Sequence, residues 1–498
     1  MLSALNSHHV ASLREALHSA VFTVDAIGEL IGPDAHRALM RNETIPARRA
    51  SSDGGALATL VRLFSLQTEV PVEAAEIALP GMVDPLCLAG VLERSVGEVR
   101  ARVDIRPYAD TGWSDGDGRD WFVVCDLTPG LDGGERRVAS DWVLGISEAS
   151  SSLAQLTIRD RVGSALDLGT GCGVQSLHLS GHADRVVATD VNERALAMAR
   201  LTSELNEAPF EVRPGSLFDP VARETFDLIA TNPPFVVSPG TGERLVYRDS
   251  GLPGDEVVRR IVTEAPDHLN PGGWCQVLAN WVHRDGEPWQ DRVAGWIRPG
   301  GCDAWVLQRE VVDLAAYVEM WLADAGLNGA PDYVRRYDAW LSWFADQGIE
   351  AIGFGWLALR NAGRDQPVMR IEEWPYEIAQ PLGPHIAAWG ARVDAAQEYA
   401  GDALLGARLV RAPDLVQETF GPPGAADPER IVVRLQQGVR RARQVDTVEA
   451  GLVGACDGDL SVGQILEALA TLLDRDAEEL RETYTPVVRE LVDEGFLS

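Results

Sequence analysis

The sequence contains no lysine, so all 44 basic residues of the 498-residue chain are arginine. We attribute this bias to codon usage in a GC-rich genome and draw no mechanism from it. The chain also has no run of 18 apolar residues and no charged-then-apolar leader after Met1, which argues against a membrane span and a secretory signal. The cytoplasm is therefore the expected location, with no membrane partner.

Paired metal-binding residues are missing as well. The six cysteines are scattered without a CxxC pair and the nine histidines form no HExxH motif, so neither disulfides nor a metal site is expected. The net charge of −31 counts against broad nucleic-acid binding, although it does not exclude a local basic groove. The seven arginines between 400 and 445 share that window with five carboxylates, so we expect a solvated face there.

Three regions are expected along the chain. Apolar residues at helical spacing predict a mainly helical, winged-helix-like N-terminal domain over 1–105. Alternating strand and helix patterns over 106–375 are typical of a Rossmann-like parallel α/β sheet, with its core at 140–310 and a helical insertion at 311–346. Residues 376–498 are expected to form a C-terminal domain that ends in a winged-helix-like module.

Short apolar runs mark the strands of the central region. The candidates are 164–168, 185–189, 210–213, 226–231, 274–279, 304–308 and 352–359. Two further strands, 103–108 and 121–127, flank a Gly/Asp-rich loop at 111–119.

A glycine-rich segment, "ALDLGTGCGVQSL", follows the first of these central strands. Glycines at 169, 171 and 173 permit a tight turn and let a ligand press against bare backbone at the start of a helix. A dinucleotide fingerprint would need Gly or Ala where Val174 stands. With Asp167 just upstream and Asp190 at the end of the next strand, placed to accept from ribose hydroxyls, the pattern favours S-adenosylmethionine.

The segment "TNPPFVVSPG" ends the strand candidate at 226–231. Two prolines remove two backbone donors and lock the turn, so the side-chain oxygen of Asn232 and the carbonyl of Pro233 become two preplaced acceptors. Such a pair suits an NH2 group, whose nitrogen lone pair is then turned toward the cofactor. Phe235 offers a flat face for stacking a planar substrate.

These motifs resemble the class I S-adenosylmethionine-dependent N-methyltransferases of the "methyltransferase small" group, which carry an (N/D)PP(Y/F) motif. The resemblance covers about residues 140–310 and implies a seven-stranded sheet whose last strand is antiparallel. It implies catalytic roles for Asn232, Pro233, Pro234 and Phe235. The cofactor contacts that it implies are Asp167, Gly169, Thr170, Gly171, Gly173, Asp190, Val191, Ser216, Leu217 and Asn232. Ser216 stands where many relatives carry an acidic residue for adenine.

The methyl acceptor stays open at this stage. The flanking domains suit a macromolecule, and Phe235 favours a nucleic-acid base such as ribosomal RNA adenine N6 or guanine N2. The alternatives are a protein glutamine of release-factor type, a small molecule, and a non-catalytic module that binds S-adenosylmethionine. Tyr247 and Arg248 are possible acceptor contacts. Segment 147–153 is expected to begin a helix capped by serine, or else to close over the methionine end of the cofactor.

Overall fold

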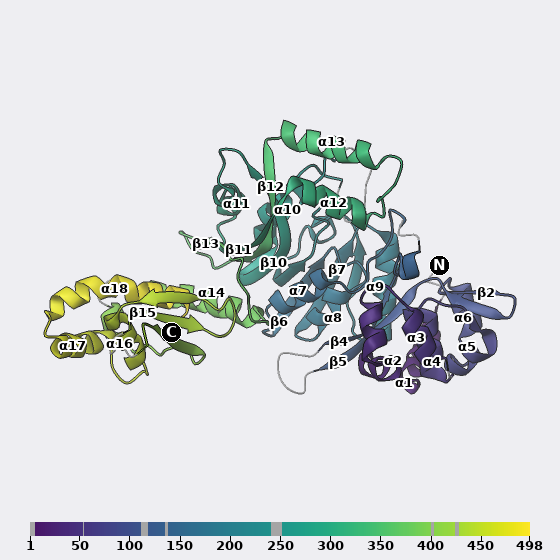
Figure 1. Ribbon diagram of the computed structural model, residues 1–498, viewed down its shortest axis with the longest axis horizontal. Coiled ribbons are helices and arrows are strands. Elements are labelled where there is room, and N and C mark those ends of the chain that lie inside the picture. The colour runs from purple at the N-terminus through teal and green to yellow at the C-terminus, as the bar shows by residue number, and fades with distance from the viewer. Residues whose placement is uncertain are drawn as a thin grey trace. The chain divides into compact units, whose positions relative to one another are not determined.

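The computed structural model divides into two compact units, and each is described by itself (Figure 1). One unit consists of Met1–Ala154 and Asp160–Glu373, the other of Gln155–Arg159 and Trp374–Ser498. The residues that the structure describes are 5–52, 54–110, 118–134, 138–240, 251–399, 403–423 and 428–498. In these ranges, no helix combines the length and the apolar character needed to cross a membrane.

An eight-stranded sheet forms the centre of the first unit, in the order β13-β11-β12-β10-β9-β6-β7-β8. Its strands are β6 (Val162–Leu168), β7 (Ala183–Asp190), β8 (Glu211–Pro214), β9 (Phe226–Thr231), β10 (Leu269–Arg284), β11 (Asp303–Asp313), β12 (Ile349–Arg360) and β13 (Met369–Glu373). Strand β12 is antiparallel to both of its neighbours, as the resemblance implies. The other strand pairs are parallel.

The expected count of seven strands is wrong by one, because β13 extends the sheet at its edge. It pairs in parallel with β11. Asp303 on β11 is fully buried, and its carboxylate accepts from the Arg364 guanidinium and from the Val368 amide, both at 2.8 Å. These contacts hold the segment after β12 against the edge of the sheet and let the eighth strand form.

Helices lie on both faces of this sheet, as expected when strands are joined by helical crossovers (Figure 1). They are α7 (Glu148–Leu156), α8 (Val174–Ser180), α9 (Glu193–Leu205), α10 (Glu256–Glu264), α11 (Trp289–Ile297), α12 (Leu314–Asp324) and α13 (Tyr333–Asp346). The last two form the helical insertion between β11 and β12 and pack against each other and against β12.

The N-terminal region of the first unit is mainly helical. It contains α1 (Ser7–Ser19), α2 (Val24–Leu39), α3 (Ile45–Ala50), α4 (Ala56–Leu60), α5 (Val72–Ala78) and α6 (Val83–Leu88), with a small sheet of β1 (Val70–Pro71), β2 (Leu92–Ser95) and β3 (Glu98–Ala101). Its apolar residues share one core with α8 and α9. The winged-helix description of this region stays a prediction.

A β-hairpin joins the N-terminal region to the large sheet. It consists of β4 (Asp104–Asp110) and β5 (Arg119–Cys125), and residues 111–117 between them lie outside the described ranges. The amides of Phe122 and Val124 donate to side chains of Asn206 and Thr202 at 2.8 and 3.0 Å. The hairpin is thereby fixed to α9 and its following loop.

The second unit combines helices with a three-stranded antiparallel sheet in the order β14-β15-β16. Its elements are α14 (Gly383–Glu398), α15 (Ala403–Gly406), β14 (Leu415–Phe420), β15 (Arg430–Leu435), β16 (Ala442–Val445), α16 (Thr447–Ala455), α17 (Val462–Leu473) and α18 (Ala477–Glu494). Capping boxes start α16 and α17, and three-residue spacing of Asp446 and Glu449 accounts for the first. A winged-helix assignment stays a prediction here too.

Candidate active site

A cavity lies where the strand order reverses, at the carboxyl ends of β6, β7 and β9. Parallel α/β sheets bind ligands at such a point because the loops diverge there. Leu168 and Thr231 end two adjacent strands, and the Thr231 hydroxyl donates to the Leu168 carbonyl at 2.7 Å. The cavity measures about 640 Å³, a size suited to a small molecule.

The glycine loop (residues 169–173) forms one wall of the cavity. Gly169 and Gly171 have φ angles of 78° and 55°, and a Cβ atom on either would meet nothing within 4 Å. The amides of Gly169 and Thr170 both donate to the Thr189 carbonyl at 2.9 Å. The loop therefore exposes bare backbone to the cavity, as its glycines predict.

Gly173 differs from the other two glycines, because it does not line the cavity. Its φ is 90°, and a Cβ atom would lie 3.1 Å from the Phe210 ring and 3.5 Å from Ala199 Cα. The residue is thus placed to let the start of α8 approach α9. The cofactor contact that the resemblance implies for Gly173 stays a prediction.

Gly173→Ala should therefore lower the free energy of unfolding by about 1–3 kcal/mol, because strained backbone and a steric clash add. Gly97→Ala is the matched control: its φ is 83° but its Cβ would meet nothing within 4 Å. Gly97→Ala should lower the free energy of unfolding by about 1 kcal/mol, because only the strained backbone contributes there. Urea unfolding measures both, and equal losses would contradict the close packing at Gly173.

Asp190 ends β7 beside the glycine loop. Its two carboxylate oxygens accept from the amides of Gly171 at 2.9 Å and Asn192 at 2.8 Å. Burial raises the pKa of Asp190, although these backbone hydrogen bonds oppose the shift. The remaining lone pairs of the carboxylate face the cavity and can accept from a ligand's hydroxyl groups.

Asp167 lies deeper, on β6. It is 1% exposed and accepts from the hydroxyls of Thr170 and Ser176, both at 2.6 Å. Burial raises the pKa of Asp167 to about 6, and the two hydroxyl hydrogen bonds lower it in part. A carboxylate in such a place favours a positively charged ligand.

Three more of the predicted cofactor contacts form another part of the lining. Val191, Ser216 and Leu217 all border the cavity. Val191 is 57% exposed, so its apolar side chain is free to cover one face of a planar base. Ser216 is exposed and lines the cavity. It occupies the position at which many relatives carry an acidic residue.

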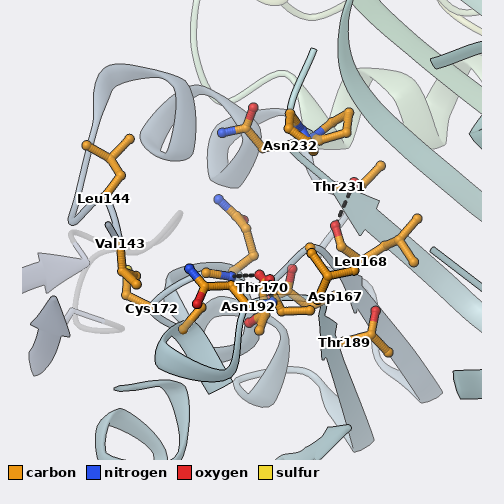
Figure 2. Close-up of a pocket in the computed structure, with 18 of the residues that line it drawn as sticks. Val143, Leu144, Asp167, Leu168, Thr170, Cys172, Thr189, Asn192, Thr231 and Asn232 are labelled. Atoms are coloured by element: carbon orange, nitrogen blue, oxygen red, sulfur yellow. Dashed lines mark hydrogen bonds between the residues drawn. The ribbon is translucent and has the colours of Figure 1, made fainter. Parts of the chain in front are cut away.

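The NPPF turn (residues 232–235) borders the same cavity. Figure 2 shows Asn232 across the cavity from Thr170 and Asn192. The Oδ1 atom of Asn232 is buried and accepts no hydrogen bond from any described residue. Since buried polar atoms are nearly always paired, an unpaired oxygen in this turn marks Asn232 as a candidate acceptor for a ligand donor.

A third wall was not predicted from the sequence. Val143 and Leu144 line the cavity on a separate side (Figure 2). Their position depends on Asp126, which exchanges hydrogen bonds with the Val143 backbone and forms an ion pair with Arg194. No motif in the sequence marks Val143 or Leu144 as cavity residues.

Segment 147–153 does begin a helix capped by serine. Ser147 directly precedes α7, and its hydroxyl accepts from the Ser150 amide at 3.2 Å. Both serines also line the cavity, and closure of the segment over the methionine end of the cofactor stays a prediction. Tyr247 and Arg248 lie outside the described residues.

The strand order and the cavity at the reversal point define an α/β protein whose glycine loop suits a nucleotide-like cofactor. Residues 145–285 match the family described as methyltransferase small domain. This segment is therefore a methyltransferase domain of the class that uses S-adenosylmethionine. Domains of unknown function (DUF7059 and DUF7782) match residues 19–102 and 387–498.

Three relatives with sequences similar to this domain are named for different methyl acceptors. A release factor glutamine methyltransferase of Geobacter sulfurreducens is 35% identical over 124 residues, 22% of this chain and 43% of the relative. A ribosomal protein uL3 glutamine methyltransferase of Bradyrhizobium diazoefficiens is 35% identical over 143 residues, 26% and 43% of the two chains. A ribosomal RNA small subunit methyltransferase C of Alcanivorax borkumensis is 30% identical over 118 residues, 24% and 32% of the two chains.

The similarity is confined to part of each protein, since the chain spans less than half the length of these three relatives. Among solved structures, a methyltransferase from Pyrococcus furiosus aligns with 43% of this chain and 83% of its own, at 19% identity and a TM-score of 0.27.

Proposed function

We propose that the protein transfers a methyl group from S-adenosylmethionine to the NH2 group of a planar, conjugated acceptor, with S-adenosylhomocysteine as the second product. The carrying observation is the buried, unpartnered Oδ1 of Asn232 in the same cavity as the glycine loop. An unmet acceptor costs folding free energy unless a ligand donor uses it. An NH2 group is such a donor.

The cofactor side of the cavity suits this proposal. S-adenosylmethionine supplies an electrophilic methyl group when it is bound. The Asp190 carboxylate would accept from the ribose hydroxyls, while Val191 covers the base. The bare backbone at Gly169 and Gly171 leaves room for close approach, and Asp167 contributes negative charge toward the cationic methionine portion.

On the acceptor side, Asn232 Oδ1 and the Pro233 carbonyl would hold the two hydrogens of the NH2 group. This removes rotational freedom before transfer and turns the nitrogen lone pair toward the methyl group. Phe235 would stack on the planar acceptor. The nitrogen needs no strong base beforehand, because its proton becomes acidic once the new N–C bond has formed.

We infer that the acceptor is a protein side-chain amide. The acidic and basic residues that line the cavity in the described ranges are four carboxylates, Asp141, Asp167, Asp190 and Glu193, and the guanidinium of Arg194, which pairs with Asp126. A nucleic acid would bring phosphates toward this negative lining, whereas a neutral glutamine amide avoids that repulsion.

Three of the seven arginines between 400 and 445 support the same inference. Arg434 pairs with Glu418, and Arg440 pairs with Glu377. Arg443 contacts three carboxylates, those of Glu449, Glu490 and Glu494. Arginines already neutralised by carboxylates offer little to a phosphate backbone.

A nucleic-acid base is the second candidate, and it was the one that the sequence favoured. The phenylalanine at position 235 supports this candidate, and one relative is named as a ribosomal RNA methyltransferase. The residue allows stacking on a base as readily as on an amide.

Labelled S-adenosylmethionine separates these candidates. The purified chain would be incubated with release factors, ribosomal proteins and ribosomal RNA, and the labelled product located by mass spectrometry as one added CH2. Label on a glutamine supports the inference, and label on a base replaces it with the second candidate. If calorimetry shows cofactor binding but no macromolecule or small molecule accepts label, the non-catalytic module replaces the proposal.

Cofactor binding should depend on pH through Asp167, whose pKa is raised to about 6. Above pH 6 the carboxylate is charged and attracts the cationic cofactor; below pH 6 it binds a proton that must leave on binding. The affinity should therefore fall by up to about tenfold per pH unit below 6, with proton release near pH 6. Calorimetry in buffers of different ionisation enthalpy measures both quantities.

Asp167→Asn is the control for this pH dependence, because the amide cannot titrate. Its affinity for S-adenosylmethionine should be lower but nearly constant between pH 5 and 8. An equally flat profile in the unaltered protein would show that Asp167 does not carry the dependence.

A further inference from the structure

The NPPF turn is held in place by a residue far along the chain. Beyond Pro234 the chain has left β9, and the amide of the fully buried Val237 donates to the Tyr317 hydroxyl at 2.7 Å. The Asn280 side chain donates to the same oxygen at 3.2 Å. Tyr317 lies on α12, in the insertion outside the region that matches the methyltransferase small domain.

The Tyr317 ring is itself locked in position. It is fully buried, and four aromatic rings surround it with centroid distances between 5.9 and 6.4 Å: Phe354, Trp321, Phe344 and Trp340. These rings come from α12, α13 and β12, which lie together at one end of the sheet (Figure 1). A ring enclosed in this way presents its hydroxyl at one fixed point.

The same face of α12 also contacts the Phe235 ring of the NPPF turn. Trp321 stands one helical turn after Tyr317, so both side chains project from one side of the helix. The Trp321 and Phe235 rings meet edge to face, with centroids 6.4 Å apart and planes at 68°. One helix therefore touches both the backbone and the aromatic side chain of the turn.

We propose that α12 positions the NPPF turn for methyl transfer, with Tyr317 fixing its backbone and Trp321 fixing the Phe235 ring. Neither residue contacts the acceptor; both act through the turn. Fixing Val237 limits how far the preceding residues can rotate, which keeps Asn232 Oδ1 and the Pro233 carbonyl converging on one point. This inference rests on the proposed function, because it assigns the turn to acceptor binding.

Tyr317→Phe tests the proposal by removing the hydroxyl while keeping the ring. Tyr337→Phe is the matched control: its hydroxyl, on the same helical insertion, donates to Glu319 at 3.0 Å. Hydrogen exchange read by mass spectrometry should show at least about tenfold faster exchange for the peptide containing Val237 in Tyr317→Phe. The peptide over β9 and both peptides in the control should be unchanged.

Kinetics supply the functional readout. With the acceptor that takes up label, Tyr317→Phe should lower kcat by about 10–100-fold, leaving the Kd for S-adenosylmethionine and the acceptor KM within about twofold. Unchanged exchange at Val237, or faster exchange with full kcat, would overturn the proposal. If Tyr317→Phe does not fold, Trp321→Phe replaces it. This variant keeps the Tyr317 hydroxyl, so its readout is kinetic: kcat should fall by about 10–100-fold with the Kd for S-adenosylmethionine within about twofold, and a full kcat would overturn the proposal.

The two hypotheses fail in different ways. Faster exchange at Val237 in a chain for which no acceptor takes up label would leave the contact real and remove the proposed function, and with it the positioning role. Label transfer by the unaltered protein, with the same rate in Tyr317→Phe, would keep the proposed function and remove only the positioning role of α12.

Discussion

Asn232→Leu should lower the rate of methyl transfer by about two to three orders of magnitude, the loss seen when one preorganised polar contact is removed from a reacting group. Leucine keeps nearly the same volume but offers no acceptor in place of the buried Oδ1. The NH2 group would then lose one of its two holding contacts, and its lone pair would no longer be oriented. Single-turnover transfer of labelled methyl groups measures this loss, and calorimetry should find S-adenosylmethionine affinity within about threefold of the original.

Asn232→Asp is the control that keeps an oxygen in the same place. It should retain a larger part of the rate than the leucine variant, because a carboxylate still accepts from the NH2 group. Equal losses in the two variants, or a collapse of cofactor binding in either, would mean that Asn232 serves the structure of the cavity and not the acceptor.

The chemistry of the cavity could be predicted because its signals are local. Glycines at 169 and 171 have positive φ angles, and the prolines at 233 and 234 end β9 at Thr231 as expected. A tight turn and a strand stop each need particular residue types at adjacent positions. These constraints are therefore visible without any knowledge of the fold.

Features that depend on distant contacts could not be predicted in this way. Strand β13, "MRIEE", contains only two apolar residues in alternation with charged ones, a pattern too short to mark a strand by itself. A buried carboxylate on β11 holds the preceding segment at the edge of the sheet, and this distant contact is not visible in the sequence. Gly173 resembles the two preceding glycines in sequence, yet only Gly173 has the Phe210 ring within 3.1 Å of the position of a Cβ atom. Tyr317 carries no motif, and its importance appears only when α12 is seen against the turn.

Asp190→Ala should weaken S-adenosylmethionine binding by about 100-fold, since hydrogen bonds to a charged group contribute about 1.5–3 kcal/mol each. The loss should be equal for S-adenosylhomocysteine, because the two ligands share the ribose that the carboxylate would hold. If Asp190 acted through its charge instead, Asp190→Ala would weaken the binding of the cationic S-adenosylmethionine more than the binding of S-adenosylhomocysteine. Calorimetric titration of both ligands measures the ratio.

The Asp190 carboxylate also accepts from the amides of Gly171 and Asn192, so Asp190→Ala could loosen the glycine loop as well. Asp190→Asn separates the two effects. Its remaining amide oxygen can still accept from one backbone amide, and its binding loss should fall between those of alanine and aspartate. At saturating cofactor, Asp190→Ala should transfer methyl groups within about threefold of the original rate, the reverse of the Asn232→Leu pattern. A loss of rate that saturation cannot restore would show that Asp190 takes part in the transfer step itself.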